Sequence, residues 1–129
     1  MVTPSRRTPQ PLVDAIRAQV PKKSFVWDGA GANPYLAILA HADAVIVTAD
    51  SVNMVGEAVA TGKPVYVYEP SGGHRKIGAY LDRLEALGAV RRWGGQLEDW
   101  SSPPINATPI IAAEIARRYR AFKAQNVKA

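Results

Sequence analysis

The fold is decided by two apolar runs, Ala44-Val45-Ile46-Val47-Thr48 and Val65-Tyr66-Val67-Tyr68. The first run is rich in β-branched residues and does not alternate with polar ones, which is typical of a central strand covered on both faces in a parallel sheet. Between the runs, Asp50 or Ser51 can cap a helix that Gly62 ends. This stretch therefore predicts a strand–helix–strand unit.

The same alternation continues outward from this unit in both directions. Strands that alternate with helices form a parallel sheet wrapped on both faces. With 129 residues, the chain is predicted to be a single domain (1–129) of the α/β class, a doubly wound parallel sheet of Rossmann-like type. The further elements expected from apolar spacing are an extended segment at 1–3, a helix at 12–20, a strand at 24–27, a helix at 35–41, a helix at 77–87, a strand at 89–90 and a last helix from Thr108.

Composition and charge narrow the class of protein. The net charge of +5 is concentrated at the two ends, since residues 28–99 hold six basic against nine acidic side chains. No basic stripe interleaved with aromatics crosses the middle, so nucleic-acid binding is not predicted. The sequence has no cysteine, and no apolar run approaches the ~20 residues that span a bilayer. A cytoplasmic protein without an integral membrane segment is therefore expected.

The loop after the first apolar run is the strongest candidate binding site. In an open parallel sheet, ligands lie beyond the carboxyl ends of the strands, where helix N-termini present unpaired amides and a positive dipole end. Successive amides there can hold a phosphate, although the loop can equally serve only to cap the helix. Glu57, further along the helix, can accept hydrogen bonds from a ribose diol or can simply face solvent. The phosphate-binding residues expected in this loop are Asp50, Ser51, Val52, Asn53 and Met54.

Two other loops supply candidate cations. Ser5, Arg6 and Arg7 follow the extended start of the chain, and Arg75 closes the loop Ser71-Gly72-Gly73-His74-Arg75-Lys76 after the second apolar run. These side chains can neutralise phosphate or can belong to surface turns. The two histidines are far apart in the sequence, so no metal site, no cofactor and no catalytic base are predicted.

Several segments together resemble one family. They are Asn33-Pro34-Tyr35-Leu36-Ala37, the stretch from Ala42 to Ser51, Thr61-Gly62-Lys63-Pro64-Val65-Tyr66-Val67, and the shorter runs 3–9 and 87–91. They resemble the elongated-mitochondria, or mitochondrial-fission, family of bacterial and plant proteins. The resemblance covers most of the chain and implies kinship with plant proteins that act in mitochondrial division.

The polar loop, Glu57-Ala58 and Gly62-Lys63-Pro64 are also similar to the donor half of GT-B glycosyltransferases. That similarity implies a GT-B C-terminal-half fold in which loop amides hold a nucleotide-sugar diphosphate and Glu57 binds the ribose. It further implies that the chain is the C-terminal fragment of a two-domain protein, with the N-terminal domain as partner across the cleft. The isolated fragment would then be inactive, because catalysis needs positioning by both halves. The last helix is a candidate homodimer contact.

Three functions follow as hypotheses. The first is the nucleotide-sugar (diphosphate) binding domain of a GT-B-like glycosyltransferase-related protein. The second is a non-catalytic protein-interaction domain on the same fold, as mitochondrial division suggests. The third, a nicotinamide-dependent oxidoreductase, is disfavoured because no G-x-G-x-x-G follows the first strand.

Overall fold

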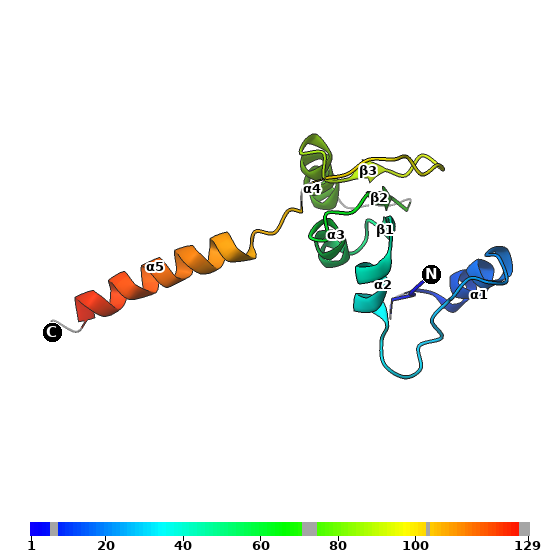
Figure 1. The fold of residues 1–129 in the computed structure, drawn as a ribbon, viewed down its shortest axis with the longest axis horizontal. Helices are drawn as coiled ribbons and strands as arrows, with labels where there is room; N and C mark the ends of the chain where they lie inside the picture. The colour runs from blue at the N-terminus through cyan, green and yellow to red at the C-terminus, as the bar shows by residue number, and fades with distance from the viewer. Residues whose placement is uncertain (6–7, 71–74, 103, 127–129) are drawn as a thin grey trace. The chain divides into compact units, whose positions relative to one another are not determined.

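The computed structural model describes residues 1–5, 8–70, 75–102 and 104–126, which fall into two compact units, 1–43 and 44–129. Helices and strands alternate through much of the chain (Figure 1). In chain order the elements are α1 (Gln10–Gln19), α2 (Tyr35–His41), β1 (Val45–Thr48), α3 (Val52–Val59), β2 (Val65–Tyr68), α4 (Arg75–Ala86), β3 (Arg91–Arg92) and α5 (Thr108–Asn126).

The first unit contains α1, α2 and one short pairing of extended segments. Val2 and Val26 form a parallel bridge, in which the Val2 amide donates to the Phe25 carbonyl at 2.8 Å and the Trp27 amide donates to the Val2 carbonyl at 3.0 Å. The extended segments predicted at 1–3 and 24–27 thus pair with each other, but only through this single bridge and not as strands. Val13 is the buried residue of α1.

The second unit is built on a parallel sheet whose order is β1-β2-β3 among the described residues. Val45 pairs with Val65, and Tyr66 pairs with Arg91. The α/β class and the parallel strands at 45–48 and 65–68 are confirmed. The expectation that the first strand is central is wrong, because β2 lies between its neighbours and Ile46 of β1 remains 51% exposed.

The third strand lies further along the chain than predicted. Ala89 and Val90, expected as the strand, are each 1% exposed and enter the core before pairing begins, and β3 itself is Arg91–Arg92. Their apolar side chains indicate that they are buried, but which residues form the strand depends on the register of the backbone pairing with β2. The expected strand is therefore displaced by two residues.

The core of this unit lies between the sheet and its two helices. One side of α3 and one side of α4 are buried, which is the outcome that the helical spacing of apolar residues predicts. Burial of this apolar surface is the main favourable term in the stability of the unit. The buried helical residues are Val55, Ala58 and Val59 of α3 and Leu81 and Leu84 of α4.

Tyr66 ties the segment after β3 to the centre of the sheet. Its ring is 2% exposed and makes edge contacts with Trp93 and Trp100, at centroid distances of 5.4 and 6.1 Å. The hydroxyl donates to the Glu98 carbonyl at 2.9 Å and accepts from the Glu98 amide at 2.6 Å. Tyr66 therefore holds residues 93–100 against β2, although these residues form no helix or strand.

The last helix, α5, begins where the Asn106 side-chain oxygen accepts from the Thr108 amide at 3.0 Å. None of its residues is buried. A search of the described residues for a helix both long enough and apolar enough to cross a bilayer finds none, α5 included.

Candidate functional site

The candidate site lies where β1 runs into α3. Ser51 adopts an extended backbone at the N-cap, and its hydroxyl accepts from the Met54 amide at 3.5 Å. The Val55 amide donates to the Ser51 carbonyl at 3.1 Å, which starts the regular ladder of the helix. The amides of Val52 and Asn53 fall in the first turn, where helix geometry supplies no carbonyl acceptor. The capping role is confirmed, and two amides point outward from the helix end.

Exposure is uneven across the predicted phosphate-binding residues. Asp50, Val52 and Asn53 are exposed, whereas Ser51 and Met54 are half-buried. Glu57 is exposed four residues after Asn53, so the two share one side of α3. The buried residues of α3 lie on its other side. Loop and helix therefore present one accessible polar surface that runs from Asp50 to Glu57.

The amino end of α4 carries the second predicted element of the site. Arg75 and Lys76 are its first two residues and both are exposed. Neither α3 nor α4 has an acidic residue in its first turn. Cations there oppose the positive end of the helix dipole, at a cost of roughly 0.3–1 kcal/mol each. Their placement therefore does not serve helix stability, and it puts two exposed cations at the amino end of α4.

Helices α3 and α4 also contact each other close to Glu57. A Cβ added at Gly56 would lie 3.6 Å from the Tyr80 hydroxyl, an ordinary van der Waals distance, so Tyr80 of α4 lies against α3 at this position. Partial burial raises the pKa of the Tyr80 phenol above its ordinary value. The neutral phenol of Tyr80 therefore lies beside α3.

The remaining predicted site residues lie in the first unit or outside the described residues. Ser5 belongs to the first unit, where its amide donates to the Thr8 hydroxyl at 2.9 Å. This contact is a local turn within residues 1–43. Arg6 and Arg7 lie outside the described residues, as do Ser71, Gly72, Gly73 and His74. The predictions made for those residues stay predictions.

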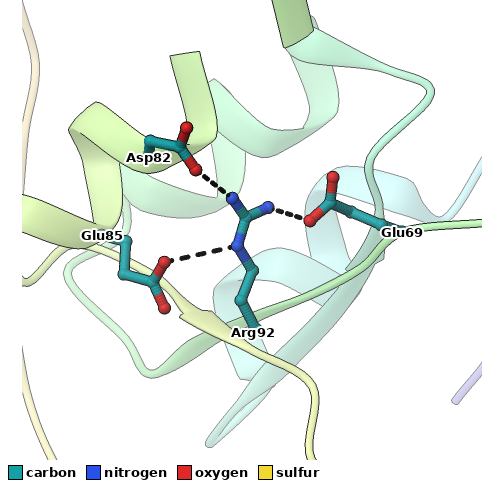
Figure 2. Close-up of polar contacts among 4 residues, drawn as sticks. All are labelled: Glu69, Asp82, Glu85 and Arg92. Carbon is teal, nitrogen blue, oxygen red and sulfur yellow. Dashed lines mark hydrogen bonds and ion pairs between the residues drawn. The ribbon is translucent and has the colours of Figure 1, made fainter. Parts of the chain in front are cut away.

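An arginine surrounded by carboxylates lies at the same edge of the sheet and was not predicted (Figure 2). Arg92 of β3 forms an ion pair with Glu69, which directly follows β2. Its guanidinium also reaches Asp82 at 2.6 Å and Glu85 at 3.3 Å, both on α4. The only sequence signal is the spacing of Asp82 and Glu85, which puts two acids one turn apart on the exposed side of a helix. The cluster joins β2, β3 and α4.

Replacing Arg92 with methionine is expected to lower the free energy of unfolding by roughly 1–2 kcal/mol, since three partly exposed ion pairs are lost together. The remaining carboxylates repel one another, so added salt should reduce the loss through screening. Urea unfolding at low and high salt measures both effects. Arg83→Met, at an exposed position of α4, is the control with the same charge change. A loss equal to that of the control would show that the cluster contributes nothing.

Comparison with known proteins gives consistent matches along the chain. A family model described as Mitochondrial fission ELM1 matches residues 1–119. The chain is 42% identical over 102 residues to the Mitochondrial fission protein ELM1 of Arabidopsis thaliana, covering 77% of this chain and 24% of the plant protein. It is 32% identical over 116 residues to an uncharacterized protein of Rickettsia prowazekii, covering 84% of this chain and 33% of the bacterial protein. The chain thus spans about a quarter to a third of these curated relatives. No solved structure matches it significantly.

Proposed function

This chain belongs to the Mitochondrial fission ELM1 family, and on that premise we propose that residues 44–129 are a doubly wound, GT-B-type half that binds the diphosphate of a nucleotide sugar at the amino end of α3. The proposal places the phosphates on the amides of Val52 and Asn53. It places the ribose against Glu57.

One observation carries the proposal: the amino ends of α3 and α4 both follow the carboxyl ends of the paired strands β1 and β2. Helices α3 and α4 both start after the carboxyl ends of paired parallel strands, with no acidic residue in either first turn. Arg75 and Lys76 add two full charges to the dipole of α4. Helix N-termini with unpaired amides are the usual phosphate sites of such folds, and added cations strengthen the attraction.

The position of Glu57 favours a nucleoside diphosphate over free phosphate as the ligand. Its carboxylate lies on the exposed side of α3, beyond the first turn. At that position it is too far along the helix to cap it, and a phosphate would be repelled by it. A vicinal diol, by contrast, donates two hydrogen bonds to a carboxylate. Phosphate at the helix end and ribose one turn further along fit the order of groups in a nucleoside diphosphate.

A nucleoside diphosphate is therefore expected to shift the amide resonances of Val52 and Asn53 in a two-dimensional NMR titration. Glu57→Ala should weaken binding of uridine or guanosine diphosphate by at least about tenfold, since hydrogen bonds to a charged group contribute about 1.5–3 kcal/mol. Binding of inorganic pyrophosphate, which lacks ribose, should not weaken. Asp43→Asn is the matched control, because it removes a carboxylate at the opposite, amino end of β1.

Two outcomes separate the hypotheses. Equal weakening by Asp43→Asn and Glu57→Ala would leave only a general charge effect and no ribose site. Absence of any shift with pyrophosphate, uridine diphosphate and guanosine diphosphate would reject the nucleotide site. It would favour the non-catalytic protein-interaction domain, which fits the name of the plant relative. Sugar transfer itself is not expected from residues 1–129, because the acceptor side is proposed to lie on the N-terminal domain of the longer protein.

A further inference from the structure

The last helix carries an apolar stripe that no part of the described chain buries. Ile111, Ile115, Tyr119 and Phe122 recur every three or four residues, so they line one side of α5. Their exposed fractions lie between 56% and 63%. The stripe runs along roughly 17 Å of helix, at about 1.5 Å per residue. An apolar surface of this kind marks a site of association.

Cations border this stripe on both sides. Four basic residues stand on α5 against the single acid Glu114, and they are Arg117, Arg118, Arg120 and Lys123. At about 100° per residue, Arg118 borders the stripe on one side and Lys123 borders it on the other. The Lys123 ammonium lies 5.6 Å from the centre of the Tyr119 ring. Both side chains thus combine an apolar body at the stripe with a polar tip beside it.

The single acid of α5 pairs with two of the four basic residues. Glu114 accepts from Arg117 at 2.8 Å and from Arg118 at 2.7 Å. These hydrogen bonds lower the pKa of Glu114 to about 2, so the carboxylate stays ionised and paired at physiological pH. Against this one acid the four basic residues leave a net charge of +3 on the helix, and Arg120 and Lys123 take no part in the ion pairs with Glu114.

We propose that α5 is an interfacial helix that lays its apolar stripe into the headgroup region of an anionic lipid bilayer. An apolar side flanked by lysine and arginine, with aromatic rings at its border, is the composition of helices that lie in that plane. Basic side chains next to the bilayer gain roughly 1 kcal/mol each from anionic headgroups. A second copy of α5 suits the stripe less well, because two such helices face to face would bring like charges together along both borders.

Sedimentation of the full chain with vesicles tests this proposal. Binding is expected to vesicles of phosphatidylcholine with phosphatidylserine, and not to phosphatidylcholine alone. It should weaken as salt is raised, because the headgroup attraction is screened. The double variant Ile115→Ser and Phe122→Ser should weaken binding by at least about tenfold, since two apolar side chains no longer insert.

Ile110→Ser is the matched control, because Ile110 is 74% exposed but lies about 100° around the helix from Ile111, away from the stripe. It should leave vesicle binding unchanged. A second variant, Lys123→Gln at the border of the stripe, should weaken binding several-fold and flatten its salt dependence. Circular dichroism of each variant checks that the helix persists.

The results that would overturn the proposal are distinct. Equal binding to neutral and anionic vesicles would show that the basic residues do not drive binding. If Ile110→Ser weakened vesicle binding as much as the double variant does, the stripe would not be the part of α5 that inserts. A dimer in analytical ultracentrifugation that the double variant dissociates, without vesicle binding, would assign the stripe to a second copy. Failure of vesicle binding with a monomeric chain would leave a protein partner as occupant. The nucleotide site is on other elements, so none of these results bears on it.

Discussion

Replacing Tyr66 with alanine is expected to lower the free energy of unfolding by about 3–5 kcal/mol, as for other buried aromatic residues. The side chain is 2% exposed at the centre of the sheet, and its loss leaves a cavity between Trp93 and Trp100. It also releases both hydrogen bonds to Glu98. Since a domain has about 5–15 kcal/mol of stability, this single change removes a large share. Urea unfolding followed by tryptophan fluorescence measures the loss.

Two further variants separate the ring of Tyr66 from its hydroxyl. Tyr66→Phe keeps the aromatic contacts, and it should cost only about 1 kcal/mol because the exposed Glu98 can exchange its lost bonds for water. Tyr68→Ala, at the 51% exposed end of the same strand, should cost much less than Tyr66→Ala. If Tyr66→Ala and Tyr68→Ala cost the same, residues 93–100 do not pack on β2 as described.

Replacing Leu81 with alanine is expected to cost about 2–5 kcal/mol, the range for buried leucines. Leu81 is fully buried on the side of α4 that faces the core, next in sequence to Asp82 of the Arg92 cluster. The variant should therefore lose hydrogen-exchange protection along α4 before β2 loses it, because α4 is then held mainly by Leu84 and by exposed ion pairs. Exchange followed by NMR measures this order together with the loss of stability.

Leu87→Ala provides the comparison for Leu81, since Leu87 lies just beyond α4 and is 58% exposed. The same atoms are removed, but little apolar surface returns to water, so a change within about 0.5 kcal/mol is expected. Similar costs for both variants would contradict the packing of α4 against the sheet. Faster exchange in β2 than in α4 would contradict the order of loss.

The local part of the site was predictable from the sequence. Ser51 is a short polar residue between an apolar run and a helical pattern, and such residues cap helices through their own hydroxyl. The helix ends at Val59, two residues before the predicted end at Thr61. Gly62 follows in a turn with a φ of 71°, a conformation that glycine adopts without steric cost. Each of these features depends on a few neighbouring residues, so a local pattern is sufficient to identify them.

The Arg92 cluster was not predictable in the same way. Glu69, Asp82 and Glu85 stand 7 to 23 residues from Arg92 in the sequence. Charges on solvated surfaces are common, and nothing in their spacing says which of them will meet. They meet because β3 pairs beside β2 and α4 packs next to both strands. The contact is a consequence of topology.

The sequence by itself determined the parallel β1-α3-β2 unit, its capped helix and the membership of the chain in its family. These follow from periodicity, turn chemistry and shared motifs, which are local properties of the chain. The tertiary structure alone decided that β2 is the central strand, that pairing of the third strand begins at Arg91, and that Tyr66 holds Glu98 across 32 residues. Those outcomes depend on which distant surfaces bury each other, and burial is a non-directional term that local spacing does not encode.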